Sequence, residues 1–314
     1  MNGKKIFLLS EEGDVTSNKV ISYLSDVHQC KIERLNFDLK FDDKNRDENI
    51  LTMLYTFVDN ISSYSSFWLR RGNFPDIKLT SKEKFLEYHI YRRYLHYLIE
   101  YKPNSLGSLV KEYDHNKLID LKKAEDCGLK VPSSKLIYNS QSALNFIKDN
   151  NNTFYITKAL NDPIRKEYEG YAIYGGFTSK VLEEELKFDQ FIFPSIIQEK
   201  IEKKYEIRSF YIKGTFYSMA IFSQKDSQTA IDFRHYNKEK PNRNVPFKLP
   251  DYIEGKLTNL MEKLELNTGS IDLIYSTNNE FIFLEVNPCG QFDWLSENCN
   301  YFIERHIAKV LKDG

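Results

Sequence analysis

Glu285 and Asn287 interrupt a run, FIFLEVNP, that otherwise has the apolar pattern of a buried strand. The preceding apolar run, SIDLIYS, carries Asp272. Asn278 and Asn279 separate the two runs, and asparagine tolerates the positive φ angles of a tight turn, so we expect a two-residue hairpin turn there. Counting outward from that turn places Asp272 directly opposite Glu285, with Asn287 on the same face.

Two carboxylates that face each other across a sheet repel, unless a positive group lies between them. Carboxylate and amide oxygens are the hard ligands that Mg²⁺ accepts. The pattern therefore predicts a magnesium site at Asp272, Glu285 and Asn287. The alternative is that Glu285 pairs with a lysine or arginine from elsewhere in the chain, which leaves Asn287 unexplained.

A second strand pair is expected around Lys213-Gly214, a favourable two-residue hairpin turn within EIRSFYIKGTFYSMAIF. Glu206 and Arg208 then share a face with an otherwise apolar stripe, at the end of the strand where a cleft edge would lie. The alternative for these two charges is an exposed strand end with a local ion pair.

Lys158 ends a short β-rich run, TFYITKAL, and is followed by a loop with glycines at positions 170, 175 and 176. Glycines let backbone N–H groups approach an anion, and the ammonium adds a charge, so this pattern favours phosphate binding. A solvated lysine beside a turn is the alternative. Neither GxxxxGK[ST] nor GxGxxG occurs, so the P-loop and dinucleotide-binding classes lack their central motif.

The composition is that of an ordinary globular chain of 314 residues, 41% hydrophobic and 28% charged. Lys and Arg number 44 against 45 for Asp and Glu, so no net field attracts nucleic acid or an anionic membrane. No stretch approaches the roughly 18 apolar residues of a membrane span, and the start of the chain is unlike a secretory signal. We expect a cytoplasmic protein whose four widely spaced cysteines stay reduced.

The chain reads as an α/β protein in three blocks, 1–105, 106–197 and 198–314. The first block opens with a strand, KIFLLS, then a helix, and continues through SSFWLRRG to a long helix that we expect Thr80 to cap. In the second, HNKLIDLKKAED predicts a capped helix with Leu121 and Ala124 facing inward, ended by Gly128.

Taken together, these residues resemble the ATP-grasp superfamily over nearly the whole chain. The resemblance is carried by Asp272 with Glu285-Val-Asn287-Pro, by HNK at 115–117, by YITK at 155–158 and by IIQEKIEKKYEIR. It implies an N-terminal pre-ATP-grasp α/β domain and two α+β lobes, matching the three blocks, with ATP held between the lobes. It also implies roles for single residues: Lys117 and Lys158 on phosphates, Glu199, Lys200 and Ile201 on adenine, Glu206 on ribose, Arg208 and Arg234 on the transferred phosphate, and Asp272, Glu285 and Asn287 on two Mg²⁺ ions.

Within the superfamily, FWLRRG, IDFR at 231–234 and NPCGQFDWL are similar to the microviridin-type and grasp-with-spasm peptide maturases. The similarity implies phosphorylation of an Asp or Glu side chain of a ribosomally made precursor peptide that carries a leader segment. A Ser or Thr hydroxyl or a Lys amine then forms a macrocyclic ester or amide. Homodimers are common among such enzymes. Arg70 or Arg71 would hold an acceptor carboxylate, or else form an interlobe salt bridge.

Two further functions are compatible with the same residues. One is an ATP-grasp ligase that joins free amino acids or adds glutamate to a protein tail, since the same metal ligands would serve it. The other is a non-catalytic module that binds a nucleotide to regulate a partner. The stretches FWLRRG and IDFR favour the peptide-crosslinking ligase over the first alternative. The non-catalytic module is disfavoured, because a suitable residue is present at every expected phosphate and metal position.

Overall fold

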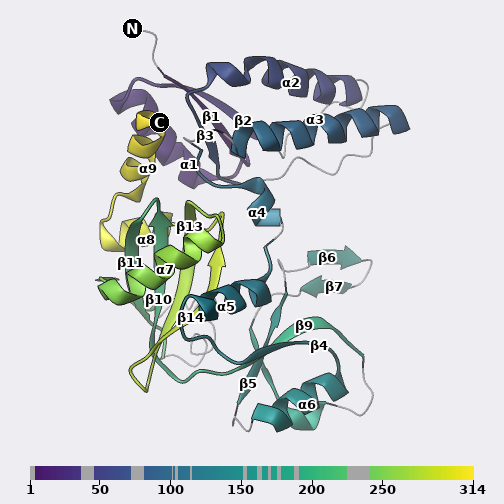
Figure 1. Cartoon of the computed structure of the whole chain (residues 1–314), viewed down its shortest axis with the longest axis vertical. Coiled ribbons are helices and arrows are strands. Elements are labelled where there is room, and N and C mark those ends of the chain that lie inside the picture. The colour runs from purple at the N-terminus through teal and green to yellow at the C-terminus, as the bar shows by residue number, and fades with distance from the viewer. Residues whose placement is uncertain are drawn as a thin grey trace. The chain divides into compact units, whose positions relative to one another are not determined.

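The computed structural model describes residues 4–36, 46–71, 81–100, 102, 105–113, 115–150, 154–160, 165–168, 171–174, 178–186, 191–224 and 241–314. Contacts divide the chain into two units, which we call the first and second units (Figure 1). The first unit joins residues 1–114 to 266–270 and 287–314, and the second joins 115–265 to 271–286.

The first unit is built on a small parallel sheet in the order β2-β1-β3. β1 spans Lys5–Ser10, β2 Lys31–Asn36 and β3 Ser66–Leu69. The helices are α1 Val15–Ser22 with a π-helical turn Tyr23–Val27, α2 Arg46–Asn60 with a 3-10 turn Ile61–Ser63, α3 Lys82–Glu100, α4 Leu109–Tyr113, α8 Asp293–Cys299 and α9 Ile303–Asp313. The expected opening, a strand followed by a helix, is confirmed.

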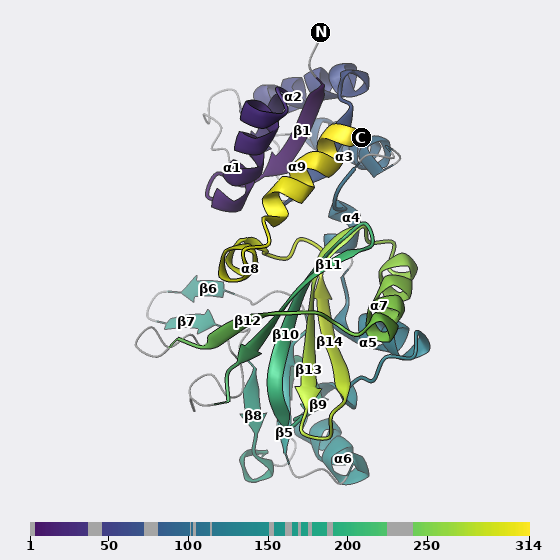
Figure 2. The ribbon, with the colours of Figure 1, turned by 90° about the vertical axis from the view of Figure 1, so that its left-hand side faces the viewer.

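Both faces of this sheet are covered, which explains the continuous apolar runs of β1 and β3. Phe7 and Leu9 of β1 and Phe67 of β3 pack in one core cluster with buried residues of α2 and α3. Alternation turns Ile6 and Leu8 to the opposite face, where α1 and the C-terminal helix α9 lie side by side (Figure 2). The last helix of the chain therefore completes the N-terminal layer.

The long helix of this unit begins one residue later than expected. α3 starts at Lys82, and Ser81 Oγ accepts a hydrogen bond of 3.2 Å from the backbone N–H of Lys84. Ser81 is thus the N-cap, and Thr80, which we expected there, lies outside the described residues.

The second unit contains a four-stranded sheet in the order β4-β9-β5-β8, flanked by α6. Its elements are α5 Lys117–Asp126, β4 Ser134–Asn139, α6 Ser140–Asn150, β5 Tyr155–Ala159, β8 Ser179–Val181, a 3-10 turn Glu183–Glu185 and β9 Phe191–Glu199, with a separate hairpin of β6 Arg165–Tyr168 and β7 Tyr171–Tyr174. The capped helix is confirmed, because Asn116 Oδ1 accepts from the N–H groups of Leu118 and Ile119. Leu121 and Ala124 are buried.

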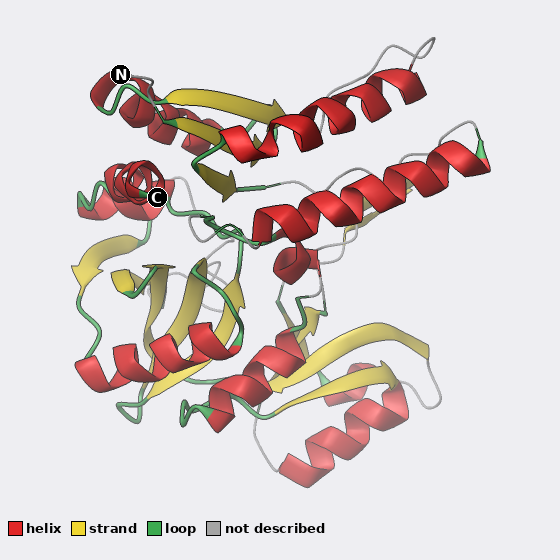
Figure 3. Ribbon diagram, turned by 45° about the horizontal axis from the view of Figure 1, so that its top comes forward, coloured by secondary structure: helices red, strands yellow, loops and turns green. Residues whose placement is uncertain are grey.

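A five-stranded sheet in the order β12-β11-β10-β13-β14 also belongs to this region. Its strands are β10 Lys203–Ile212, β11 Thr215–Phe222, β12 Arg243–Phe247, β13 Thr268–Ser276 and β14 Phe281–Asn287, and α7 Asp251–Lys263 lies beside α5 (Figure 3). The predicted hairpin is confirmed: Lys213 and Gly214 both have positive φ, and Ile212 pairs with Thr215.

The predicted two-residue turn at Asn278 and Asn279 is wrong by one residue. Asn279 N donates to Ser276 O, and Ser276 N donates to Glu280 O, so the loop has three residues and closes on Ser276 and Glu280. Asn279 takes the positive φ of 62°, as in a type I turn with a bulge. A two-residue turn therefore cannot be the reason that Asp272 and Glu285 come together.

The predicted α/β fold class is confirmed. The expected division into three blocks, with boundaries at 105 and 197, stays a prediction. The contacts distinguish two units, and they group the C-terminal segment 287–314 with the first unit. In the described part of the chain, no helix has the length and apolarity needed to cross a bilayer.

Candidate active site

The second unit contains a cavity lined by both of its sheets and by the segment that joins them. β9 ends at Glu199 and β10 begins at Lys203, so residues 200–202 form the connection. Backbone hydrogen bonds hold it in place, from Glu199 N to Ser133 O at 2.9 Å and from Lys200 N to Phe154 O at 3.0 Å. The cavity receives seven of the residues predicted from the sequence: Lys158, Glu199, Lys200, Ile201, Glu206, Asp272 and Glu285.

Asp272 on β13 is engaged by an arginine from the neighbouring strand. Nη1 of Arg208, on β10, lies 2.8 Å from Oδ1 and 2.7 Å from Oδ2 of Asp272. The side chains are only 11% and 14% exposed, so the pair is largely shielded from water. Asp272 lines the cavity and Arg208 does not, so the guanidinium is tied to the cavity through a carboxylate that is itself a candidate metal ligand.

Glu285 on β14 faces a second cation. Oε2 of Glu285 lies 3.4 Å from Nζ of Lys117, the first residue of α5, and both side chains are less than one-fifth exposed. Asn116 fixes the start of α5 by capping it, and so sets where Lys117 begins. The alternative in which Glu285 pairs with a lysine is thus realised in this structure, and the partner is a residue that the resemblance assigns to phosphate.

The oxygen donors at this end of the cavity fit a hard divalent cation. Asp272 and Glu285 reach it from adjacent strands, and Asn287 follows two residues later on β14, on the face of Glu285 by strand alternation. Each carboxylate is balanced by one organic cation, and a metal ion could take over that role. No cluster of three or more His, Cys, Asp or Glu side chains suited to a metal occurs in the described residues, so this candidate depends on two carboxylates and an amide.

Glu206 is buried, with its carboxylate engaged by Lys203 and, at 2.8 Å, by Ser223 Oγ. Burial raises the pKa of Glu206 above its usual range, although Lys203 and Ser223 act in the opposite direction. Lys203 also lines the cavity, and the sequence analysis did not identify it. Strand alternation places positions 203 and 206 on opposite faces, so no sequence pattern indicated that they would pair.

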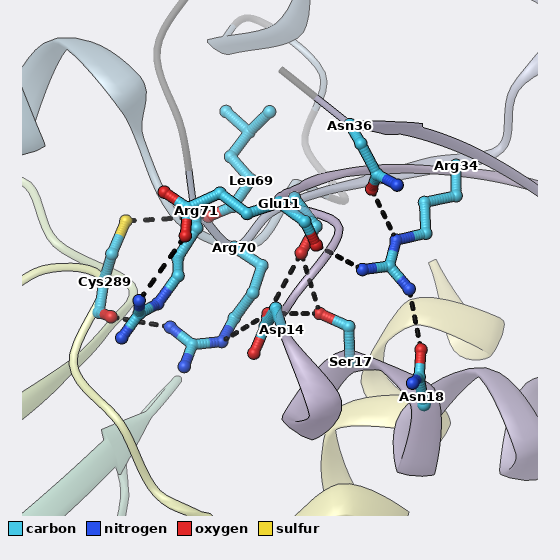
Figure 4. A network of polar contacts seen from close by, with 11 residues as sticks. Glu11, Asp14, Ser17, Asn18, Arg34, Asn36, Leu69, Arg70, Arg71 and Cys289 are labelled. Atoms are coloured by element: carbon cyan, nitrogen blue, oxygen red, sulfur yellow. Dashed lines mark hydrogen bonds and ion pairs between the residues drawn. The ribbon is translucent and has the colours of Figure 1, made fainter. Parts of the chain in front are cut away.

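Arg70 and Arg71 belong to the first unit, where they follow β3 (Figure 4). Arg70 is 3% exposed; its Nη1 donates to Cys289 O at 2.6 Å, and its Nε lies 3.5 Å from Asp14 Oδ2. Arg71 is more exposed, with Nη1 3.6 Å from the Glu11 carboxylate. Both arginines lie just beyond the end of β3, and they reach different acids of the first unit, Asp14 and Glu11.

Asp14 is the centre of a buried polar cluster that the sequence analysis missed. It accepts hydrogen bonds from Ser10 and Ser17, and both serines are fully buried. Burial alone raises the pKa of Asp14, but Arg70 and the two hydroxyl groups outweigh burial and lower it. An ionised Asp14 therefore balances the buried Arg70.

Arg234, proposed with Arg208 for the transferred phosphate, lies outside the described residues, as do the glycines at 170, 175 and 176. All four cysteines are free, as expected. The predicted roles of the individual site residues remain predictions.

No protein-family model matches this sequence, and a search of curated proteins gave no match. Solved structures do match. A RiPP-associated ATP-grasp ligase of Chryseobacterium gregarium, in complex with ADP and a leader and core peptide, has a TM-score of 0.74 at 24% identity, covering 99% of this chain and 96% of that chain. The macrocyclase MdnC of Microcystis aeruginosa, bound with its precursor peptide MdnA, has a TM-score of 0.71 at 24% identity, covering 98% and 99%.

A third match is the ATP-grasp ligase PsnB complexed with a minimal precursor, Mg and ADP. Its TM-score is 0.68 at 13% identity, and 98% of this chain and 96% of that chain are covered. These likenesses extend over the whole chain and include both units described above. The ATP-grasp resemblance inferred from the sequence is therefore confirmed at the level of the fold, and the chain has the fold of the ATP-grasp ligases.

Proposed function

We propose that this chain is an ATP-dependent, ADP-forming ligase that acts on a ribosomally made precursor peptide. It phosphorylates an Asp or Glu side chain of the peptide and joins the acyl group to a Ser or Thr hydroxyl or to a Lys amine. The observation that carries the proposal is the cavity of the second unit, where Lys158, Glu206, Asp272 and Glu285 meet within a chain that has this fold over its full length.

In this proposal, ATP occupies that cavity. Lys158, which lines the cavity, and Lys117, which pairs with the cavity residue Glu285, bind its phosphates. The segment from Glu199 to Ile201 contacts adenine. The buried carboxylate of Glu206 accepts hydrogen bonds from the ribose hydroxyls, in exchange for or in addition to the Ser223 hydroxyl. Lys203 and Ser223 both contact Oε1 of Glu206, and a buried carboxylate has several acceptor positions that a ligand can supply with its own hydroxyl groups.

Asp272, Glu285 and Asn287 would hold the metal, for which the proposal takes two Mg²⁺ ions. When bound, Mg²⁺ neutralises negative charge on the phosphate groups. Arg208, freed from Asp272, then has its guanidinium available to the transferred phosphoryl group and to the oxyanion of the acyl intermediate. Arg234 is proposed for the same task.

The reaction balances in two steps. A carboxylate oxygen of the peptide attacks the γ-phosphorus of ATP, the bond to the bridging oxygen breaks, and ADP leaves with an acyl phosphate formed. The hydroxyl or amine then attacks the acyl carbon, inorganic phosphate departs, and the nucleophile gives up one proton. The sum is one ester or amide bond for each ATP converted to ADP and phosphate.

The partner is a precursor peptide with a leader segment. We propose that the chain forms a homodimer and works in the cytoplasm, where ATP is abundant and thiols such as Cys289 stay reduced. The fold match to ligases solved with precursor, leader or core peptides supports this choice of substrate class over free amino acids.

The proposal is tested by incubating the chain with Mg-ATP and candidate precursor peptides, with mass spectrometry of the peptide and assay of the nucleotide. We expect the peptide to lose the mass of one water molecule for each bond formed, with ADP as the product. ATP turnover with an unchanged peptide would favour the ligase of free amino acids or protein tails. Nucleotide binding with no turnover on any acceptor would favour the regulatory module.

A further inference from the structure

The loop that follows β14 is tied to the rest of the first unit at successive residues. Cys289 N donates to Glu112 Oε2 at 3.1 Å, and Cys289 O accepts from Arg70 at 2.6 Å. Gly290 N donates to Asn287 O at 3.0 Å, which closes a tight turn. Ser270 Oγ donates to Gln291 O at 3.0 Å. The backbone immediately after Asn287 is therefore held by several partners.

Close packing at Gly290 reinforces these hydrogen bonds. A Cβ atom at Gly290 would overlap the Ser270 side chain and would lie 2.9 Å from the Ser270 backbone nitrogen. Such contacts leave the loop no room to move toward β13. The turn that begins at Asn287 thus has one arrangement compatible with its surroundings.

Arg70 is the buried cation of this set, with a side chain that is 3% exposed. Its guanidinium lies between Cys289 O and the ionised Asp14 (Figure 4). The Phe292 ring centroid is 5.7 Å from the guanidinium carbon. A hydrogen bond from a buried charged donor is stronger than one from a neutral donor. An arginine enclosed in this way is suited to fixing a backbone carbonyl, and poorly suited to receiving an acceptor carboxylate from outside.

We infer that Arg70 is a positioning residue for the amide of Asn287, acting through the carbonyl of Cys289. This inference rests on the proposed function, because it assigns Arg70 a purpose only if Asn287 binds the metal. It replaces the expectation that Arg70 holds a substrate carboxylate. That expectation remains open for Arg71, whose side chain is about one-third exposed.

The test measures metal binding without turnover, with Mn²⁺ as a paramagnetic probe of the ADP complex. We expect Arg70→Gln to weaken Mn²⁺ binding by about 10-fold, in the range seen when a partner that orients a metal ligand is lost. Arg70→Lys keeps the charge and one donor nitrogen in place of three, so we expect an intermediate value. Arg71→Gln is the matched control and should bind Mn²⁺ like the wild type.

Glu112→Ala provides a second route, because Glu112 is exposed and its loss leaves no buried charge. It releases the same loop from the other side and should also weaken Mn²⁺ binding, with the Tm nearly unchanged. Steady-state kinetics complete the test: Arg70→Gln should lower kcat and leave the KM for peptide unchanged.

Wild-type Mn²⁺ affinity in both Arg70→Gln and Glu112→Ala would overturn the inference. So would an increased peptide KM in Arg70→Gln with unchanged Mn²⁺ affinity, since that result would identify a substrate ligand. Failure of the wild-type protein itself to bind Mn²⁺ with ADP would contradict the proposed function, which keeps the two failures distinguishable.

Discussion

Arg208 donates from one nitrogen to both carboxylate oxygens of Asp272, at 2.8 and 2.7 Å. Lys117 and Glu285 form a similar pair at 3.4 Å. In each pair, a residue proposed for phosphate neutralises a residue proposed for metal. Binding of metal by the carboxylates and of phosphate by the cations would break the same two ion pairs, so the two events should favour each other.

The metal assignment predicts that Asp272→Asn and Glu285→Gln each abolish Mg-dependent turnover. Losing a partner that only orients a ligand costs about 10- to 100-fold, so losing a ligand should cost on the order of 100-fold or more. ADP formation across a range of Mg²⁺ concentrations measures this. Asp251→Asn is the matched control, because its side chain is 97% exposed on α7. Wild-type-like activity in either site variant would refute the assignment.

Arg208→Gln should remove both the stabilising ion pair with Asp272 and the competition between Arg208 and Mg²⁺ for that carboxylate. Without nucleotide, the largely buried Asp272 loses its cation, and we expect a loss of stability of about 1–3 kcal/mol. Added Mg²⁺ should then raise the Tm of the variant more than that of the wild type, because the ion no longer competes with the guanidinium. Thermal unfolding with and without Mg²⁺ measures both effects. If Mg²⁺ raises the Tm of the variant and of the wild type equally, Arg208 and Mg²⁺ do not compete for Asp272.

Because His96 on α3 is partly buried, we expect the free energy of unfolding to fall in mild acid. Burial, with a smaller contribution from Arg92, lowers the pKa of His96 to about 4 from its ordinary 6.5. The unfolded chain takes up a proton below pH 6.5 and the folded chain only near pH 4, so stability is fully present above pH 6.5 and is lost as the pH falls between these values.

From pH 7 to pH 5 we expect His96 to cost about 1 kcal/mol, after allowance for partial solvent screening. Urea unfolding at the two pH values measures it, and His96→Gln should reduce the difference. His306, whose pKa burial also lowers, leaves part of the effect in place. A variant as sensitive to pH as the wild type would contradict the role of His96.

Replacement by alanine should lower the stability at Gly290 and raise it at Gly255. Gly290→Ala forces a Cβ against Ser270, so we expect destabilisation of about 1–3 kcal/mol. Gly255 lies inside α7 and is exposed, and a Cβ added there would meet no atom within 4 Å, so Gly255→Ala should stabilise by about 0.5–1 kcal/mol. Chemical unfolding compares the two. The packing argument fails if Gly290→Ala is as stable as the wild type.

Local chemistry explains why several elements could be predicted. Lys213-Gly214 and Asn116 act through φ angles and hydrogen bonds to near neighbours, and both predictions were confirmed. At the other hairpin, the positive φ of Asn279 was correctly expected, yet the loop length was not. Two-residue and bulged three-residue loops both place asparagine at positive φ, so residue type alone does not distinguish them.

By itself, the sequence determined the α/β class, the strands and helices with clear periodicity, and the set of oxygen-bearing and basic residues from which a nucleotide site could be built. Only the tertiary structure decided which of them meet. Arg208 and Asp272 are 64 residues apart, and Arg70 and Cys289 are 219 apart. Such contacts depend on how sheets and loops pack, and no local period records them. The sequence left open whether Arg70 or Arg71 holds a substrate carboxylate or forms a salt bridge, and the structure shows Arg70 as a buried contact between the end of β3 and the loop after β14.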